Sequence, residues 1–222
     1  HSSPYIFSSV MVDPEKVYLY HITSIENLPS IVDSGGPKSK NRLLAEETGH
    51  RSIAYGHIQE RRAQCEVPCA AGGCLHDYVP FYFGPRSPML YAIHGGYVDG
   101  YDDGQQPILH LVTKVSMILE EELSFAFTDR HAALTYASFF EDVKDLDKVD
   151  HDLMRNEYWH DTDKYPQRKE RRQAEFLIYQ FLPFDVIGAI GVINEEIKAQ
   201  VLDALEPLDE PPPVIVKQKW YY

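Results

Sequence analysis

The sequence predicts a mixed α+β domain. Short segments rich in β-branched and aromatic residues outnumber the long amphipathic segments, and several of them follow one another without an intervening helix. The chain has 222 residues, of which 44% are hydrophobic and 12% aromatic, so it can bury a full core. These observations exclude a mostly disordered protein. We expect one domain over residues 17–222, preceded by an arm over residues 1–16.

The first strand and helix of the domain follow this arm directly. The arm contains two prolines, which favours a loosely held segment, and its opening His1-Ser2-Ser3 is interpreted as a cloning remnant. Residues 17–22 are β-branched and aromatic, which is typical of a buried strand. Residues 24–32 carry apolar residues at helical spacing behind a Ser/Thr cap, and two glycines then end this predicted helix.

The next stretch is predicted to hold a helix over residues 54–62 and a strand over residues 78–83. Pro80 lies inside that strand, and a proline cannot donate to a ladder, so we expect an edge or a bend there. Residues 89–93 form an apolar run of no assigned type.

Two further strands are predicted over residues 108–112 and 125–128. Thr128 or Asp129 is expected to cap a helix over residues 130–140. Residues 141–166 are dense in charge and aromatic side chains, which predicts a short helix followed by a long loop.

The C-terminal third supplies the most apolar strand, over residues 174–181, and a second strand within residues 184–192. Asn194 is expected to start a helix over residues 195–205. A Pro-rich bridge then leads to a final strand over residues 214–216.

The charge balance argues, by itself, against a nucleic-acid partner. Asp and Glu number 34 against 21 Lys and Arg, a net charge of −13. The distribution revises this, because nine acidic residues lie in 141–163 and six in 195–210, whereas residues 168–172 carry four basic residues and one acidic residue. We therefore expect weak, salt-sensitive binding to nucleic acid rather than none.

Three cysteines, Cys65, Cys69 and Cys74, lie within one stretch that also contains His76. Such a group can be read as a zinc site, but its spacing has no second ligand pair, so we favour a reduced loop and expect no metal. The few cysteines indicate a reducing, cytoplasmic location. The sequence contains no long apolar run and no apolar leader, so we expect no membrane association.

The nucleotide-binding loops of other enzyme classes are missing from the sequence. No Gly-x-Gly-x-x-Gly follows a strand, and there is neither a Walker loop nor a Gly-x-Ser-x-Gly elbow. His21 and Glu175 stand out because each lies in an apolar strand, where an unpartnered carboxylate is costly. His21 can be a hydrogen-bonded structural histidine, and Glu175 can be an outward-facing residue of a half-exposed strand; alternatively, both line a cleft. Arg62, beside Arg61, can be a solvent-exposed residue at the end of a helix.

Six segments, taken in order, resemble the DarT family of DNA ADP-ribosyltransferases, in its thymidine-modifying branch. They begin with Tyr20-His21-Ile22-Thr23 and Arg51-Ser52-Ile53-Ala54, the latter followed by His57 to Arg62. The others are Leu75 to Tyr91, Phe127 to His131, Arg171 to Leu177 and Trp220-Tyr221-Tyr222. The resemblance runs from about residue 17 to the end of the sequence.

This resemblance implies the ADP-ribosyltransferase fold, with two small antiparallel sheets clasping NAD. It implies that ADP-ribose moves from NAD onto a thymine ring nitrogen in single-stranded DNA, in a sequence-specific way. The implied catalytic residues are Glu175 and Arg62, with His131 in support. The implied NAD contacts are His21, Ile22, Thr23, Ser30 and Arg62. The implied DNA contacts are Arg86, Met89, Tyr91, Tyr158, Trp159, Lys169, Arg171, Arg172 and Gln173.

The resemblance also implies a toxin that is paired with a macrodomain antitoxin of the DarG type. Two alternatives stay open from the residues alone. One is transfer to RNA, protein or guanine on the same fold, and the other is a non-catalytic module that binds nucleic acid.

Overall fold

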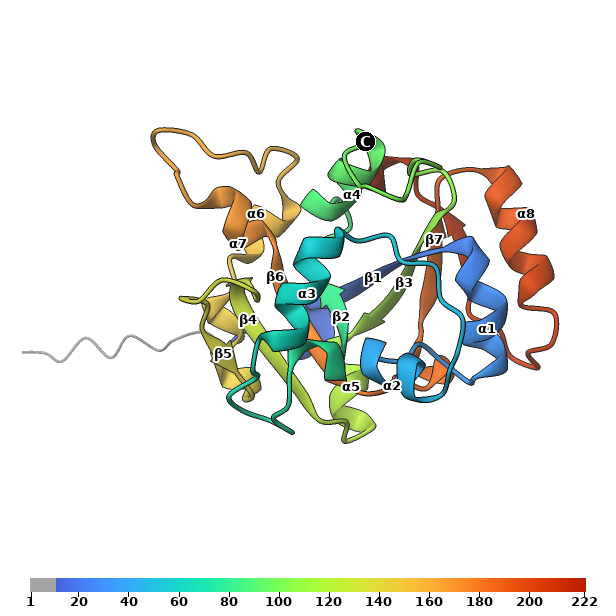
Figure 1. Ribbon diagram of the computed structural model, residues 1–222, viewed down its shortest axis with the longest axis horizontal. Coiled ribbons are helices and arrows are strands. Elements are labelled where there is room, and N and C mark those ends of the chain that lie inside the picture. The colour runs from blue at the N-terminus through green and yellow to red at the C-terminus, as the bar shows by residue number, and fades with distance from the viewer. Residues whose placement is uncertain (1–10) are drawn as a thin grey trace, which may run out of the picture.

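The computed structural model describes residues 11–222, and its core element is one eight-stranded sheet (Figure 1). The interpretation of His1–Ser3 lies outside the described residues. The strand order is β5-β4-β6-β2-β1-β3-β7-β8, and every neighbouring pair is antiparallel except β7 with β8. The strands are β1 (Tyr18–Ser24), β2 (Tyr78–Tyr82), β3 (Ile108–Lys114), β4 (Phe125–His131), β5 (Phe139–Phe140), β6 (Ala174–Tyr179), β7 (Ala189–Val192) and β8 (Val214–Val216).

The sheet consists of two four-stranded halves that are joined weakly in the middle. β1 pairs with β3 over seven residue pairs and β2 pairs with β6 over five, but β1 and β2 share only the pair Tyr20 with Tyr82. The α+β prediction is therefore confirmed, and the two expected sheets are these two halves of one sheet. Pro80 lies where the halves part, as its missing N–H requires.

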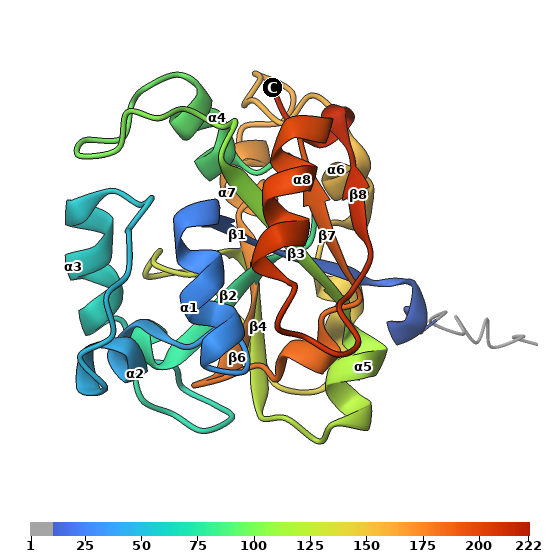
Figure 2. The ribbon, with the colours of Figure 1, turned by 90° about the vertical axis from the view of Figure 1, so that its right-hand side faces the viewer.

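Short helices surround both halves of the sheet. In Figure 1, α3 crosses in front of the sheet centre, α6 and α7 lie on one side, and α8 lies on the other. Figure 2 shows α1 and α8 side by side. The helices are α1 (Leu28–Asp33), α2 (Lys40–Ala45), α3 (Gly56–Gln64), α4 (Pro88–His94), α5 (Val115–Glu120), α6 (His151–Arg155), α7 (Arg168–Arg172) and α8 (Glu195–Ala204).

The hydrophobic core divides into one large and two small clusters of buried side chains. The large cluster packs the strands against α5, α8 and the 3-10 turn near residue 184, with Leu19, Leu111 and Phe176 among its fully buried members. One small cluster lies under the Cys-containing loop around Tyr78, and the other joins α4 to the segment that ends at Tyr222. Hydrophobic burial of this extent stabilises the scaffold on which the polar cleft residues are held.

Most of the predicted strands are confirmed, and so is the helix after Asn194, whose side chain accepts from the Ile197 N–H at 2.9 Å. The helix predicted over residues 130–140 is wrong. β4 continues to His131, a turn follows, and β5 returns beside β4. Tertiary pairing of His131 with Ala174 on β6 overrides the local capping signal.

Four helices were not predicted, namely α2, α4, α5 and α7. Each has five to seven residues, too short for a helical period to emerge from the sequence. Ser87 explains why residues 89–93 are helical, because its hydroxyl accepts from the Leu90 N–H at 3.1 Å and Pro88 occupies the first turn.

The arm expected over residues 1–16 is described only from residue 11. Its residues Pro14–Lys16 form a 3-10 turn, and Glu15 bonds Lys114 at 2.5 Å and Ser116 at 2.7 Å. Among the residues from 11 onwards, no helix has the length and apolar character needed to cross a membrane.

His110, in the middle of β3, connects the core to the Trp220–Tyr222 segment. Its Nε2 donates to the Pro85 carbonyl at 2.8 Å, and its Nδ1 lies 3.2 Å from the hydroxyl of Tyr221, which donates its proton to the Ile108 carbonyl at 2.7 Å. Burial, opposed by the hydrogen bond to Pro85, lowers the pKa of His110 to about 4.

We expect His110 to make the protein acid-sensitive. An unfolded histidine takes up a proton near pH 6.5 and the folded His110 does not until about pH 4, so stability falls as pH drops through this window. The wild-type unfolding free energy should fall by about 3 kcal/mol more than that of His110→Gln between pH 7 and pH 4. Urea unfolding at both pH values measures this, and equal losses in the two proteins would contradict it.

Candidate active site

The candidate active site lies where the two halves of the sheet part. The His21 Nδ1 donates to the Pro80 carbonyl at 2.7 Å across the gap, in place of a backbone ladder bond. A carbonyl can only accept, so Nδ1 carries the proton and Nε2 keeps its lone pair. Burial lowers the pKa of His21, against the smaller effect of the bond to Pro80, so the ring is neutral at pH 7.

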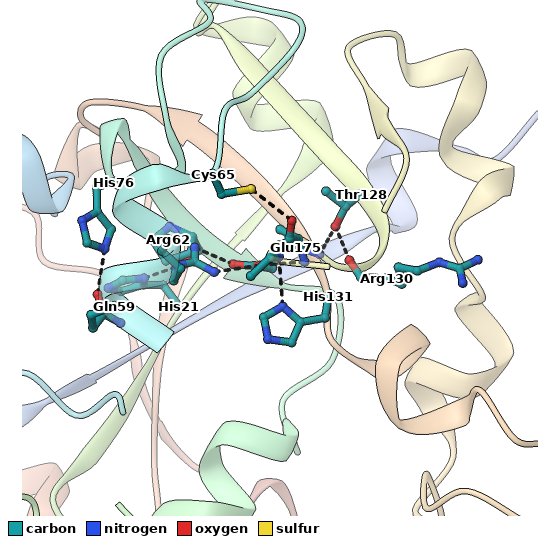
Figure 3. A network of polar contacts seen from close by, with 12 residues as sticks. His21, Gln59, Arg62, Cys65, His76, Thr128, Arg130, His131 and Glu175 are labelled. Atoms are coloured by element: carbon teal, nitrogen blue, oxygen red, sulfur yellow. Dashed lines mark hydrogen bonds and ion pairs between the residues drawn. The ribbon is translucent and has the colours of Figure 1, made fainter. Parts of the chain in front are cut away.

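Glu175 lies on β6 with its carboxylate almost fully buried, at 3% exposure. Arg62, at the C-terminal end of α3, donates to both of its oxygens, from Nη1 to Oε2 at 3.0 Å and from Nη2 to Oε1 at 2.9 Å (Figure 3). The Ala132 N–H adds a weaker bond to Oε2 at 3.3 Å. The outward, half-exposed position considered for Glu175 is thereby excluded.

Arg62 is itself buried, with 8% exposure, which excludes the solvated helix terminus considered for it. Burial alone would lower its pKa, but the adjoining Glu175 carboxylate raises the pKa of Arg62 on balance. Arg62 is therefore a permanent cation, and the bidentate pair fixes the direction of both side chains.

A bulge in β4 shapes the other wall beside Glu175. The register shifts between Phe127 and His131, and in this interval the Thr128 hydroxyl accepts from the Glu175 N–H at 3.0 Å and donates to the Arg130 carbonyl at 2.6 Å. This side chain replaces a ladder partner. The bulge thus brings the Ala132 N–H to the Glu175 carboxylate.

His131 follows the bulge and faces the same site. Its Nδ1 accepts from the Ala133 N–H at 3.2 Å, which leaves Nε2 as the protonated nitrogen of the neutral ring (Figure 3). Burial lowers the pKa of His131, with an opposing effect from Glu175. At neutral pH His131 is therefore a neutral hydrogen-bond donor.

Two adjoining pockets open onto this polar centre. The larger is an open cleft, and its lining includes all the residues predicted to contact NAD, namely His21, Ile22, Thr23, Ser30 and Arg62. The smaller is lined by Glu175, Arg62 and His131, the predicted catalytic and supporting residues, together with Met89 and Gln173. His21, Ile22 and Arg62 belong to both pockets, so the two spaces share a wall.

A family model described as "ssDNA thymidine ADP-ribosyltransferase, DarT" matches residues 20–222 of the sequence. The chain belongs to the DarT family. It is 44% identical over 211 residues to a DNA ADP-ribosyl transferase of Thermus sp. strain 2.9, a match that covers 94% of this chain and 98% of that protein. The family resemblance inferred from the six segments is confirmed.

Solved DarT structures have the same fold. Thermus sp. 2.9 DarT in complex with ADP-ribosylated ssDNA is 43% identical, with a TM-score of 0.88 over 94% of this chain and 98% of that one. The same protein in complex with NAD+ gives a TM-score of 0.85 at 39% identity, over 95% and 100% of the two chains. A DNA ADP-ribosyl transferase–DNA ADP-ribosyl glycohydrolase fusion protein of Thermosipho africanus is 24% identical over 189 residues, 84% of this chain and 45% of that protein.

Several polar residues of this DarT-family cleft were not identified from the sequence. Asn27, Gln59 and His76 line the larger pocket, and Gln59 bonds the His76 Nε2 at 3.0 Å. Tyr82 pairs with Glu175 across β2 and β6 and lines the smaller pocket, and burial raises its pKa, with a further effect from Glu175. Tyr82 lies beside Glu175 because of the register between β2 and β6. In the sequence, Tyr82 is one of several aromatic residues in an apolar run that is typical of a buried strand.

The residues predicted to contact DNA divide into accessible and buried sets. Tyr158 is 72% exposed, Lys169 is exposed, and Arg86, Tyr91 and Arg171 are half-buried. Met89 and Gln173 line the smaller pocket beside Glu175. The accessible side chains come from the turn before α4, from α4, from α7 and from the residue 156–167 segment.

Trp159 and Arg172 differ from the expectation, because both are buried, at 2% and 3% exposure. The Trp159 indole N–H donates to the Tyr222 hydroxyl at 2.7 Å. Arg172 donates to the carbonyls of Leu153 and Asn156 and, at 3.1 Å, to that of Arg86. In this conformation neither side chain is accessible to DNA, because both are engaged in contacts with the backbone and the core. The sequence gives the residue types but does not show that these side chains are buried.

Three cations of α7 have no acidic partner among residues 11–222, because the one carboxylate of this helix pairs with another residue. Glu170, the one acidic residue of α7, accepts from Arg130 at 2.8 Å and from the Tyr136 hydroxyl at 2.5 Å. Among the described residues, Arg168, Lys169 and Arg171 have no ion-pair partner. The local positive charge predicted for this segment is therefore present at the surface.

The three cysteines are free thiols in a loop that packs near β4. Cys65 lies 3.5 Å from the Ala132 carbonyl, and burial raises its pKa despite the nearby Arg62. Within the part of the chain that the structure describes, no group of three or more His, Cys, Asp or Glu side chains is arranged to hold a metal ion.

The Arg62–Glu175 pair should be costly to break from one side. Arg62→Met leaves a buried carboxylate without its partner, and we expect a loss of about 3–5 kcal/mol in unfolding free energy by urea denaturation. The double variant with Arg62→Met and Glu175→Met should recover most of this loss, because no buried charge remains.

The matched control is Arg155→Met, which breaks the exposed pair with Asp152 and should cost far less. Equal losses of unfolding free energy for Arg62→Met and the double variant would contradict the expectation, because they would show that the unpaired charge is not the cause of the destabilisation.

Proposed function

We propose that this protein transfers a single ADP-ribose from NAD to thymidine in single-stranded DNA and releases nicotinamide. The observation that carries the proposal is the buried Arg62–Glu175 pair in a chain of the DarT family: Arg62 lines both pockets, and Glu175 lines the smaller one. The residues predicted to contact NAD line one pocket, and the predicted catalytic residues line the other. NAD is consumed as a substrate, and the mechanism needs no metal.

Glu175 is the proposed electrostatic catalyst. The bond from nicotinamide to the ribose carbon breaks with its electron pair leaving on nicotinamide, and positive charge builds on the ribose. A carboxylate held by Arg62 and the Ala132 N–H is already oriented and desolvated, so it stabilises that charge without reorganisation. A thymine ring nitrogen then forms the new bond to the same carbon, and its proton is released.

Arg62 has two proposed roles, and free-base chemistry is not one of them. Its pKa is raised by Glu175, so it cannot remove the thymine proton. It instead stabilises the negative charge that develops on the thymine as the proton leaves toward the Glu175 carboxylate. The same guanidinium lines the larger pocket, where it can bind the pyrophosphate of NAD.

The proposed NAD contacts are His21, Ile22, Thr23 and Ser30. The His21 Nε2 lone pair accepts a hydrogen bond from a ribose hydroxyl, because Nδ1 is committed to Pro80. The His131 Nε2–H, on the opposite wall, is proposed to support the acceptor base.

The proposed DNA path runs over α4, α7 and the 156–167 segment. Lys169, Arg171 and Arg86 bind phosphates, which position the strand without reading its sequence. Met89 and Gln173 contact the target base in the smaller pocket, and the exposed ring of Tyr158 stacks on a flanking base. Tyr91 supports this surface from α4. A single strand leaves its bases unpaired, so no duplex has to be opened.

Modified DNA is harmful to the cell that contains it, so the proposed partner is an antitoxin of the macrodomain type that removes the adduct. The Thermosipho africanus fusion of a transferase with a DNA ADP-ribosyl glycohydrolase supports this pairing. We propose a cytoplasmic location for both proteins.

The proposal is tested by incubating the protein with NAD and a panel of oligonucleotides, and weighing the products by mass spectrometry. Thymidine-containing single strands should gain one ADP-ribosyl group, and Glu175→Gln should lower the rate by 10²–10³-fold or more. RNA, protein and guanine-only DNA serve as competing acceptors. Modification of one of these, with none on thymidine, would refute the proposed substrate.

The basic residues of α7 should control DNA affinity but not NAD affinity. Arg171→Ala should raise the KM for oligonucleotide and reduce the slope of log affinity against log salt by about one, because one phosphate contact is lost. The control is Lys198→Ala on α8, on the other side of the molecule from α7 (Figure 1), which should leave both quantities unchanged. Equal slopes for the two variants would place the DNA elsewhere.

A further inference from the structure

Tyr222 connects three segments that the proposed function places on the DNA-binding side. Its hydroxyl accepts from the Trp159 indole N–H at 2.7 Å and lies 2.9 Å from the Arg86 carbonyl and 3.2 Å from that of Ser87. A tyrosine hydroxyl has one proton and two lone pairs, so it shares its proton between these two carbonyls, with the shorter bond to Arg86, while it accepts from Trp159. One oxygen atom thus bonds the 156–167 segment to the turn between β2 and α4.

The Tyr222 ring makes a second set of contacts with the same elements. The Arg86 guanidinium lies over this ring, 4.4 Å from its centre, and Tyr91 packs edge-on against it at 5.2 Å. Tyr91 in turn contacts the Trp159 ring edge-on at 5.6 Å. The ring is therefore a platform for α4 and for the Arg86 side chain.

Arg86 is held by these contacts but is not neutralised by them. Its buried Nε is the one side-chain polar atom in the described residues that is buried and without a hydrogen-bond partner, and it has no ion-pair partner there. The guanidinium therefore keeps its charge beside the 156–167 segment, and the Tyr222 ring fixes its position. The platform keeps this cation in place before the ligand arrives.

Arg172 also bonds the turn at Arg86 to the segment that follows α6. Its guanidinium donates to the carbonyls of Leu153 and Asn156, at the end of α6, and to the Arg86 carbonyl at 3.1 Å. The Arg86 carbonyl therefore accepts from both Arg172 and Tyr222. Because burial lowers the pKa of Arg172 only to about 10, Arg172 stays charged at neutral pH.

We propose that Tyr222 is a positioning residue for DNA binding, which holds Arg86 and the 156–167 segment together as one preformed surface. This inference rests on the proposed function. Tyr222 lines neither pocket, so it acts through the residues that it holds rather than on NAD or the reacting atoms. Without its hydroxyl, Trp159 would keep a buried N–H with no acceptor, and the 156–167 segment would leave its present position part of the time.

The test is Tyr222→Phe, which removes the hydroxyl but keeps the ring under Arg86. The KM for oligonucleotide should rise about ten-fold, because only the fraction of molecules with the surface assembled binds DNA. The KM for NAD and the kcat at saturating oligonucleotide should stay unchanged. Hydrogen exchange should become faster in residues 156–167 and not in β1 or β6.

The matched control is Tyr221→Phe, which removes the neighbouring buried hydroxyl. Tyr221 bonds the Ile108 carbonyl at 2.7 Å and faces His110, away from the 156–167 segment. This variant should lose thermal stability with no change in the KM for oligonucleotide. Trp159→Phe should also raise the KM for oligonucleotide. The double variant with Tyr222→Phe should have the same KM as Tyr222→Phe alone, because both changes remove the same hydrogen bond between Trp159 and Tyr222.

Three outcomes would overturn the proposal. They are an unchanged KM for oligonucleotide in Tyr222→Phe, an equal rise in Tyr221→Phe, or a parallel rise in the KM for NAD, which would indicate general loosening. A wild-type protein that transfers no ADP-ribose to DNA would refute the proposed function itself. An active wild type with an unaffected Tyr222→Phe refutes only the role of Tyr222.

Discussion

The pairing of a buried carboxylate with a buried guanidinium is the constraint on which the rest of this structure depends. Glu175 lies in the interior of β6, and a strand interior cannot hold an isolated charge without a large desolvation cost. Among residues 11–222, Arg62 is the one cation that bonds both carboxylate oxygens, and it lies on α3, 113 residues before Glu175 in the chain. The position of α3 across the centre of the sheet is therefore dictated by an electrostatic requirement as much as by packing.

The departures from a regular sheet occur around this pair. β1 and β2 separate after one residue pair, β2 contains a proline, and β4 bulges opposite Glu175. Each irregularity frees or redirects a backbone group, and each freed group has a side-chain partner: His21 for the Pro80 carbonyl, and Thr128 for the Glu175 N–H. A regular ladder would have closed the cleft. The cost of opening it is offset by side-chain hydrogen bonds that also orient the proposed reactive groups.

The sequence was informative where local pattern and tertiary environment agree. The predicted strands that became β1 and β6 are mostly apolar. His21 and Glu175 stand out in them as polar residues, so both could be identified from the sequence as residues with either a structural role or a position in a cleft. It was uninformative where long-range pairing decides. The end of β4 carries a capping signal that strand pairing overrides, and Trp159 and Arg172 look like surface residues in a charged loop until their carbonyl and hydroxyl partners are in view. Burial of a polar side chain depends on what the rest of the chain brings to it, and that information is not local.

The acidic net charge and a DNA substrate are compatible because the charges are separated in space. Glu170 is the one carboxylate of α7, and its ion pair with Arg130 removes it from competition for the neighbouring cations. The remaining cations of α7, with Arg86 against the Tyr222 ring, are the proposed phosphate contacts, while α8 carries acidic residues on the other side of the molecule (Figure 1). A small set of cations binds few phosphates, so non-specific affinity stays low and a strand that offers no target base dissociates quickly. On the proposed function, selectivity then has to come from contacts near Glu175, and a DNA-binding surface whose elements are bonded to one another would hold the target base there.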